Sequence, residues 1–491
     1  MKRLLDWFKR EVIVSGQRRG AVADPLDAPL LYFSEDPCDA WTVRSACQGT
    51  QVFGSTGSGK SSGSARLIAH AMLRAGTGGL VLTCKPDERD VWQRYCAETG
   101  RTKDLVAFSP SQPWRFNFMQ YEYCRAGVGA RLTENLVRLF GTLAEVIDRK
   151  SQNGGQDYWR RAMNQLVRNA VELAAISRGV PTLDLVAQII ATAPSSPEEV
   201  VSPAWQDVSV CHACIVEGEA AQKDELQRAD WPQVVCFWTR EFPALSPRTR
   251  SCIVSMFTTL SEQFLRGEIR RLFCSDINID PEITFNDRKI LVIDLPVKEY
   301  DDVGALSQVL WKFVWQRAVE RRDVRVHPHP VFLWADESQH FTTRYDATFQ
   351  MTSRSVRAMT VYLTQSLANY NAVMTRHETD SLLANLATRV WHRNNCTVTN
   401  AAASETIART RQFRWNSGTS TTDDANGEQR VSRNVGGTDS IEHQILPGEF
   451  QLLRNGGPPN QCLVDGIVYE NGRIWSNGRN YLRVTFSQND A

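Results

Sequence analysis

The stretch Gly54-Ser55-Thr56-Gly57-Ser58-Gly59-Lys60-Ser61 decides the fold class of this chain. Residues 49–53 before it have the composition of a short strand, and residues 64–73 after it have helical spacing. Glycines allow successive backbone N–H groups to turn toward phosphate oxygens, and the start of the helix adds a favourable dipole. Lys60 suits the β- and γ-phosphates, and the Ser61 hydroxyl suits Mg²⁺. We therefore expect a nucleoside triphosphate to bind Gly54, Ser55, Thr56, Gly57, Ser58, Gly59, Lys60, Ser61 and Ser62.

Composition sets broad limits on the class of protein. The chain has 491 residues, of which 42% are hydrophobic and 23% charged, so it is long enough to bury a large core. The net charge of +1 means that a nucleic-acid partner would require basic residues concentrated locally. Its twelve cysteines are scattered, which favours a reducing compartment. A structural zinc site would need a second close cysteine pair at the right spacing from Cys211-His212-Ala213-Cys214. The sequence has none, so we expect ordinary thiols at Cys211 and Cys214.

The sequence gives no sign of an integral membrane span. No run of 18 apolar residues occurs, and a cytoplasmic location is expected. The start, residues 1–10, is basic and amphipathic but lacks the apolar core of a signal peptide. A segment that touches a membrane surface and a simple terminal helix both remain open for it.

Short β-branched runs indicate the buried strands of a mostly parallel sheet. Most alternate with helical patterns, which favours an α/β domain with crossover connections. The expected strands cover residues 79–83, 104–108, 290–294, 331–335, 360–364 and 388–392, with two more near 461–465 and 481–486.

The region from about 125 to 275 lacks a strand series and shows helical periods, so we expect an inserted all-α domain. The nucleotide-binding domain would then consist of residues 45–124 and 276–491, preceded by an N-terminal segment, 1–44. Residues near 414–438 are polar and rich in Gly, Ser and Thr, which favours a mobile polar loop.

A second functional pattern ends the strand at 331–335. Asp336 and Glu337 follow it directly, where a parallel strand delivers its last residues to the ligand-binding edge of the sheet. Asp336 is expected to hold the Mg²⁺ shell, and Glu337 to orient and deprotonate the attacking water. An acidic turn in solvent is the alternative for an isolated Asp-Glu pair. The phosphate-binding loop upstream favours the catalytic interpretation.

Further polar residues accompany the next strand. Gln365 follows residues 360–364 and could position water or contact the γ-phosphate, or simply cap the strand. Arg354 and Arg357 precede that strand. Either arginine could be presented across a subunit interface to stabilise charge on the phosphoryl group, and a solvated basic face is the alternative.

With these motifs, the chain resembles the conjugative coupling ATPases of type IV secretion systems, the TraG/TraD-like group, which belong with FtsK and HerA among ring-forming DNA pumps. The resemblance extends from about residue 45 to the C-terminus. Its most specific element is the combination of both nucleotide motifs with the helical insertion and the Thr-Gln-Ser strand end. The similar segments are 53–60, 80–88, 331–337, 363–366, 384–390 and 446–450.

The resemblance implies a RecA-like P-loop NTPase fold with ATP and Mg²⁺ as cofactors. It implies phosphate and Mg²⁺ contacts for Lys60 and Ser61, metal and water roles for Asp336 and Glu337, and a γ-phosphate sensor at Gln365. Arg354, with Arg357 as the second choice, would be the finger acting in trans. The role of Lys85 stays open.

The resemblance also implies partners. They are DNA held without sequence preference in a central channel, further copies of the chain in a hexamer, and secretion-channel or relaxosome proteins. Typical coupling proteins begin with transmembrane helices, which this sequence lacks, so recruitment to the inner face of the membrane is one expectation. Two other functions remain open: a motor that recruits protein substrates, and a nucleotide-gated docking platform.

Overall fold

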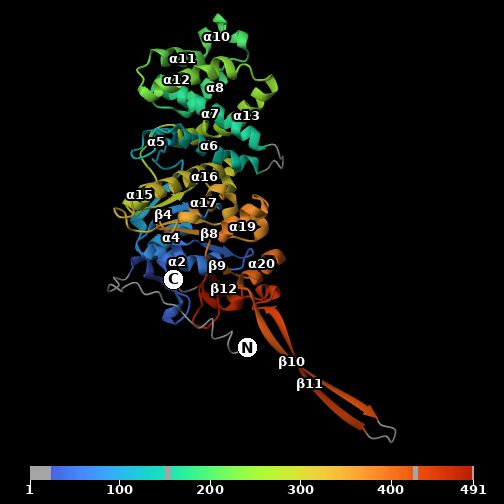
Figure 1. Cartoon of the computed structure of the whole chain (residues 1–491). Coiled ribbons are helices and arrows are strands. Elements are labelled where there is room, and N and C mark those ends of the chain that lie inside the picture. The colour runs from blue at the N-terminus through green and yellow to red at the C-terminus, as the bar shows by residue number, and fades with distance from the viewer. Residues whose placement is uncertain (1–23, 150–155, 424–428, 489–491) are drawn as a thin grey trace, which may run out of the picture.

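A nine-stranded sheet forms the centre of the molecule (Figure 1). The computed structural model of the chain describes residues 24–149, 156–423 and 429–488. The order of strands across the sheet is β13-β12-β9-β3-β8-β7-β4-β6-β5. The strands are β3 (Thr50–Phe53), β4 (Gly78–Leu82), β5 (Leu105–Phe108), β6 (Ile290–Ile293), β7 (Val331–Ala335), β8 (Ala358–Thr364), β9 (Thr388–Trp391), β12 (Leu463–Glu470) and β13 (Tyr481–Ser487).

The sheet is parallel from β9 to β5, and β12 and β13 extend it antiparallel beyond β9. This confirms the predicted α/β class with a mostly parallel sheet. Each strand expected from the sequence is present within two residues of its expected ends, except that the strand expected near 461–465 continues to Glu470 as β12. A small hairpin of β1 (Pro29–Tyr32) and β2 (Ala40–Thr42) was not anticipated.

Alternate side chains of the buried strands pack into two cores, one on each face of the sheet. In β7, Phe332 and Trp334 enter the core beneath α3 (Arg66–Arg74) and α4 (Glu88–Glu98), which also includes Trp41 of β2. Leu333 and Ala335 enter the core on the opposite face. The helices that contribute to this second core include α16 (Val297–Arg321), α17 (Arg344–Thr352), α18 (Leu367–Asn371), α19 (Arg376–Ala384) and α20 (Thr397–Ile407).

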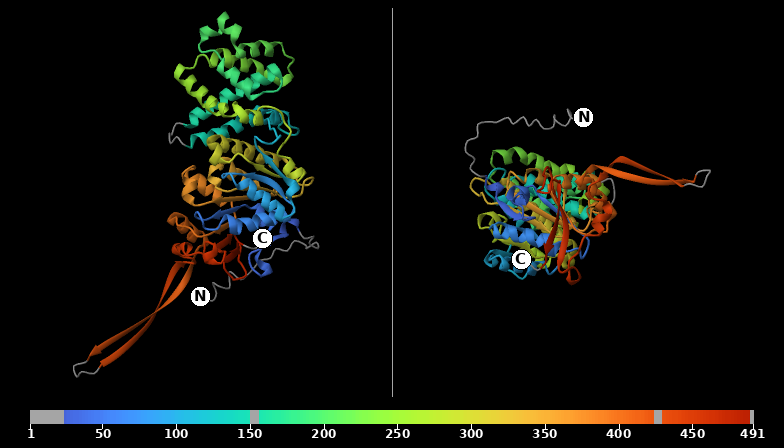
Figure 2. Two further views of the ribbon diagram at one scale, coloured as in Figure 1. Left: turned by 180° about the vertical axis from the view of Figure 1, so that it is seen from behind. Right: turned by 90° about the horizontal axis from the view of Figure 1, so that it is seen from below.

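Between β5 and β6 the described residues contain helices and no named strand. These helices extend away from the sheet to one end of the molecule, and their core is continuous with that of the nearer sheet face (Figures 1 and 2). They are α5 (Phe118–Cys124), α6 (Thr133–Asp148), α7 (Gln156–Arg178), α8 (Leu183–Ala191), α9 (Pro197–Val200), α10 (Pro203–Val208), α11 (Val210–Ala220), α12 (Glu225–Cys236), α13 (Pro247–Phe264), α14 (Gly267–Phe273) and α15 (Ile283–Asn286).

The structure corrects the expectation of a polar loop near 414–438. The strands β10 (Arg409–Asp423) and β11 (Gln429–His443) pair antiparallel in register over their whole length. Both views in Figure 2 show this two-stranded ribbon projecting from the body. The physical reason is an alternation of apolar with polar residues along both strands, such as Phe413 and Trp415 in β10, which a composition-based argument overlooks.

Two expectations concern the N-terminal region and the membrane. Residues 1–10, the amphipathic start, lie outside the described residues. Within the described part of the chain, no single helix combines the length and apolar composition needed to cross a membrane. Tyr158–Arg178 and Leu183–Ala191 reach that length and composition only as a pair, and they are bent by 113°.

Candidate nucleotide-binding site

The predicted phosphate-binding loop connects the central strand β3 to a π-helical turn, Ser61–Ala65, that continues into α3. Gly57 and Gly59 have positive φ values of 71° and 82°, which glycine adopts without a steric penalty. A Cβ on Gly59 would lie 2.5 Å from Cγ2 of Val464. The sequence therefore needs glycine at Gly59 both for the turn and for the close approach of β12.

The loop also carries an unpaired polar group. The Ser58 hydroxyl is buried and has no hydrogen-bond partner in the described structure. A Cβ on Gly54 would lie 2.3 Å from this oxygen. A buried hydroxyl without a partner is costly, and a phosphate oxygen would satisfy it. The loop thus has the backbone turn and the free polar group that a phosphate requires.

Two acidic residues face the loop from the end of β7. Lys60 Nζ lies 3.3 Å from Glu337 Oε1 and 3.8 Å from Asp336 Oδ1, and all three side chains are buried. Ser61 Oγ donates to Asp336 Oδ2 at 3.3 Å. Glu337 adopts the left-handed conformation with φ 47°, and its N–H donates to Asp336 Oδ1 at 2.9 Å. This turn directs both carboxyl groups toward the loop.

Gln365, at the end of β8, connects the loop to the acidic pair. Its Nε2 donates to Glu337 Oε1 at 3.2 Å, and its Oε1 accepts from Thr56 Oγ1 at 3.2 Å. Asn394 Nδ2 donates to the Gln365 carbonyl at 2.7 Å. The structure therefore brings Lys60, Ser61, Asp336, Glu337 and Gln365 together at the carboxyl edge of three strands.

Glu337 is ionised at neutral pH in this setting. Burial raises the pKa of its carboxyl, but the Lys60 charge and hydrogen bonds from Gln339, Gln365 and Lys60 outweigh burial and hold the pKa below its ordinary value. Gln339 donates from Nε2 to Glu337 Oε2 at 3.0 Å and is itself fixed by Thr364, whose hydroxyl donates to Gln339 Oε1 at 2.8 Å. Sequence reasoning missed Gln339, and its place two residues after Glu337 was the available signal.

Lys85 and Glu88 border the acidic pair from the end of β4. Lys85 Nζ lies 3.1 Å from Asp336 Oδ2 and 3.9 Å from Glu88 Oε1. Burial opposes the charge on Lys85, but the carboxylates of Asp336 and Glu88 raise its pKa overall. Burial and the Asp336 charge raise the pKa of Glu88 to about 8. The sequence identified Lys85 without a role, whereas Glu88 was not singled out.

His392 packs against the π-helical turn that follows the phosphate-binding loop. Its ring is fully buried at the end of β9, with Nε2 lying 2.7 Å from Ser64 Oγ and Nδ1 lying 2.9 Å from the Asp465 carbonyl. Burial lowers its pKa to about 4, so the ring is neutral at physiological pH. His392 and Ser64 were not expected at the site, because the contact joins residues 328 positions apart.

The predicted finger, Arg354, is not part of this constellation. It is exposed in the turn that precedes β8, whereas Gln365 follows the other end of that seven-residue strand. At about 3.3 Å per residue, about 20 Å separates the two ends. Arg357 shares the turn, and its Nη1 donates to the Pro328 carbonyl at 2.6 Å. Neither guanidinium reaches the loop within one chain.

The oxygen groups at the site suit Mg²⁺. Ser61 Oγ and Asp336 Oδ2 already lie within 3.3 Å of each other, and hard cations prefer oxygen ligands. In the described residues, no cluster of three or more His, Cys, Asp and Glu side chains is arranged to hold a metal by itself. Mg²⁺ in nucleotide sites typically uses one or two protein oxygens together with phosphates and water, so the residues present fit the ion.

Comparisons with known proteins find similar solved structures but no similar sequences. No family model matches the chain, and no curated protein sequence does. The bacterial conjugative coupling protein TrwB in unbound form is similar over 96% of this chain and 91% of its own, with a TM-score of 0.60 and 15% identity. TrwB in complex with ADP and Mg²⁺ is similar over 94% of this chain and 89% of its own, with a TM-score of 0.61 and 14% identity.

VirB4 of Thermoanaerobacter pseudethanolicus also matches, with a TM-score of 0.45 and 11% identity over 90% of both chains. The two TrwB structures are the basis of the comparison, because they match 96% and 94% of this chain with TM-scores of 0.60 and 0.61. The chain therefore has the P-loop NTPase fold that is seen in the conjugative coupling protein TrwB.

Proposed function

We propose that this chain is a Mg²⁺-dependent ATPase that works in a ring as a DNA-moving motor of the type IV secretion coupling type. The observation that carries the proposal is the meeting of Lys60 and Ser61 with Asp336, Glu337 and Gln365 at one edge of the sheet. The likeness to TrwB, which has been solved with ADP and Mg²⁺, supports both the nucleotide and the coupling role.

With ATP bound, Lys60 would leave Glu337 and contact the β- and γ-phosphates. Ser61 and Asp336 would hold Mg²⁺, which supplies positive charge to the phosphate oxygens. Glu337 Oε1, released from Lys60, would accept a proton from the attacking water as its oxygen bonds to the γ-phosphorus. The bond from that phosphorus to the bridging oxygen breaks, and ADP leaves. Gln365, already placed beside Glu337, would orient the water.

A test of the chemistry compares Glu337→Gln with Lys60→Ala. Loss of the proton acceptor should lower ATP turnover by about 10²- to 10⁴-fold while nucleotide affinity is retained. Lys60→Ala should weaken nucleotide binding as well. Steady-state phosphate release and binding of a fluorescent ATP analogue would measure the two effects. Glu198→Gln in the helical region is the control, and full hydrolysis by Glu337→Gln would contradict the assigned base.

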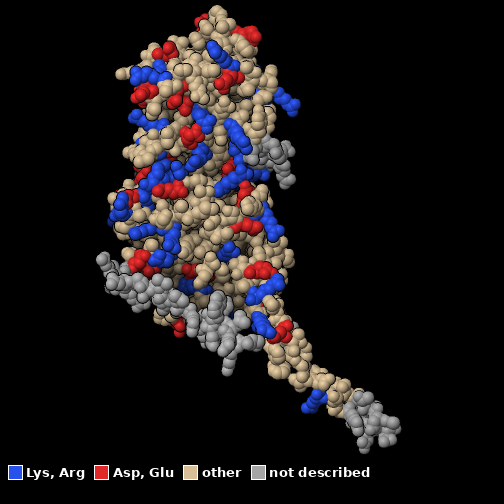
Figure 3. Space-filling model, in the orientation of Figure 1, with Lys and Arg blue, Asp and Glu red and all other residues tan. Residues whose placement is uncertain are grey.

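The proposed cargo is DNA contacted through its phosphates. Positive and negative side chains are interspersed over the face in Figure 3, so this face does not offer DNA a surface of one charge. The proposal places the DNA in a channel between copies. DNA should stimulate ATP hydrolysis. Because binding releases counterions, the affinity for DNA should fall by about 10³-fold between 50 and 200 mM salt for six phosphate contacts, and the DNA concentration needed for half-maximal stimulation should rise accordingly. Stimulation by a protein substrate but not by DNA would favour the protein-recruiting alternative.

A further inference from the structure

The ribbon formed by β10 and β11, here called the arm, gathers its exposed hydrophobic side chains on one face, here called the apolar face. This face also carries Arg433 and an ion pair of Arg411 with Asp439. Because side chains alternate along a strand, Phe413 and Trp415 share a face with Val431, Val435 and Ile441 of the paired strand. On the opposite face, the residues whose side chains the structure describes are polar or glycine, among them Gln412, Asn416, Gly418, Ser432, Asn434, Gly436 and Thr438. All five hydrophobic side chains of the apolar face are exposed.

The aromatic residues of the arm are presented in a fixed arrangement. The rings of Phe413 and Trp415 meet edge to face, with centroids 4.9 Å apart. Gly437 makes room for them, because a Cβ there would lie 2.0 Å from Cζ of Phe413. Trp415 nevertheless remains 73% exposed. Aromatic anchors that are rigid and exposed are typical of residues that dominate an interface.

The arm has little support from its own chain. It forms a separate two-stranded sheet. At its root, Arg409 forms an ion pair with Glu405 of α20, and His443 Nε2 lies 3.0 Å from Glu405 Oε1. A two-stranded ribbon alone is marginally stable in water. An apolar face of this extent is therefore expected to be covered by a partner.

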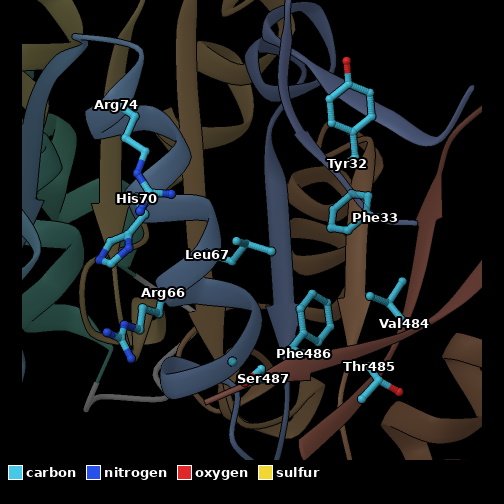
Figure 4. A pocket seen from close by; sticks show the side chains of 11 residues that line it. Tyr32, Phe33, Arg66, Leu67, His70, Arg74, Val484, Thr485, Phe486 and Ser487 are labelled. Atoms are coloured by element: carbon cyan, nitrogen blue, oxygen red, sulfur yellow. The ribbon is translucent and has the colours of Figure 1, made fainter. Parts of the chain in front are cut away.

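A groove on another part of the molecule is lined by aromatic and aliphatic side chains, which suit the hydrophobic side chains of the arm (Figure 4). It lies between α3 and β13 and has a volume of about 600 Å³. We call it the aromatic groove, lined by Tyr32, Phe33, Leu67, Val484 and Phe486, with Arg66, His70 and Arg74 on α3. Tyr32 is half exposed, so apolar surface remains open to a ligand.

The two surfaces face different sides of the molecule. In all three views of Figures 1 and 2 the arm leaves from the side opposite α2 (Val43–Cys47) and α4. The groove belongs to the α4 side, since His70 in its lining contacts Glu98 at the end of α4 with Nε2 3.0 Å from Oε2. Contacts between different patches on opposite sides are head-to-tail, and they build rings when the rotation closes.

The size of the arm indicates which partner it fits. Fifteen residues at about 3.4 Å each extend about 50 Å, and a ribbon about 10 Å wide offers about 500 Å². A stable interface buries about 800 Å² on each side, so the arm alone is too small to hold a separate protein. It suits a neighbour already in contact elsewhere, such as the next copy in a ring.

We infer that the apolar face of the arm binds the aromatic groove of a second copy of this chain. Phe413 and Trp415 enter the space between α3 and β13 of the neighbour. This inference rests on the proposed ring assembly and names one interface within it. Because α3 continues from the phosphate-binding loop, the arm of one copy lies against the helix that begins at the nucleotide site of the next.

Site-specific photo-crosslinking of the full chain tests this contact. Benzoylphenylalanine in place of Trp415 should crosslink a second copy, and peptide mapping by mass spectrometry should find the groove segments 32–33, 63–74 or 484–487. The same probe in place of Asn416, on the polar face, should give at least tenfold less of this product. Crosslinks from Trp415 only to another arm, or only to positions outside the groove, would overturn the inference.

Paired variants test the consequence for assembly. Phe413→Ser with Trp415→Ser on the apolar face, and separately Tyr32→Asp in the groove, should each raise the protein concentration needed for ring formation at least tenfold in mass photometry. Gln412→Ser with Asn416→Ser is the matched control and should assemble like the original chain. If the apolar-face variant assembles normally while the original chain forms rings, the arm contact is refuted and the proposed motor stands.

If the original chain stays monomeric with ATP and DNA present, both the ring and the arm contact are refuted. Nucleotide binding by the monomer would then still be measurable through the Lys60→Ala comparison.

Discussion

At the scale of single residues, the site is a balance of buried charges. Lys60 and Lys85 each approach the acidic pair, and Glu88 lies behind Lys85. Glu88 also accepts the N–H of Cys84 at 2.7 Å, so its side chain closes the turn that follows β4. The turn is therefore coupled to the protonation of a carboxyl group whose pKa lies near neutrality.

Stability should depend on pH through Glu88. Burial and the Asp336 charge raise its pKa from 4.5 to about 8, so the stability that its proton contributes is fully present below 4.5 and is lost as pH rises through about 8. Glu88→Gln removes this titration and keeps an oxygen for the Cys84 N–H. Thermal unfolding from pH 6 to 9 should show the original chain losing stability faster than the variant, and parallel curves would contradict the assignment.

At the scale of elements, a buried ion pair joins the helices behind the acidic strand. Lys312 of α16 and Asp346 of α17 form an ion pair with no exposed surface. Asp346 also accepts from Gln316 at 2.9 Å and from the Tyr362 hydroxyl of β8 at 2.7 Å. Burial opposes the charge of Asp346, but the Lys312 charge and the hydrogen bonds from Lys312, Tyr362 and the Thr343 N–H lower its pKa overall. The cluster ties together the elements that flank β7 and β8.

Breaking this pair should be costly. Lys312→Met leaves a buried carboxylate without its counter-ion, and the expected loss is about 3–5 kcal/mol in the free energy of unfolding. The double change Lys312→Met with Asp346→Asn should recover part of that loss. Arg376→Met is the control, because its pair with Asp380 is exposed and worth below about 1 kcal/mol. Denaturant unfolding measures all three, and a loss below 1 kcal/mol for Lys312→Met would refute the role.

At the scale of the whole molecule, the position of Arg354 limits what it can do. It lies at the sheet edge away from the loop of its own chain and is exposed there. A finger role is therefore possible only toward the nucleotide of another copy. Arg357 is the weaker candidate, because its guanidinium is bound to the Pro328 carbonyl.

Subunit mixing tests this arrangement. Arg354→Ala subunits keep a working phosphate-binding loop, and Lys60→Ala subunits keep the arginine. Random mixing in equal amounts should pair the two intact parts at about a quarter of interfaces and restore a matching share of ATP turnover. Arg357→Ala subunits should retain activity without mixing. Absence of any rescue in mixed rings would show that Arg354 does not act across an interface.

The sequence by itself determined the strands of the sheet and the candidate nucleotide residues. Glycines at fixed spacing, apolar runs and the acids after Ala335 are local patterns. Because parallel strands deliver their ends to a common edge of the sheet, the sequence alone predicts that Lys60, Asp336 and Gln365 lie close together.

Only the tertiary structure decided the rest. Gln339, Glu88 and His392 reach the site through packing between distant segments, which no local pattern encodes. The structure also separated Arg354 from its own loop. It also showed that the segment near 414–438, expected to be a loop, belongs to the arm. There, strand pairing across 15 residues places Phe413 and Trp415 on the same face as valines of the other strand. Register and side-chain contact are properties of paired elements, and they appear only when the chain is folded.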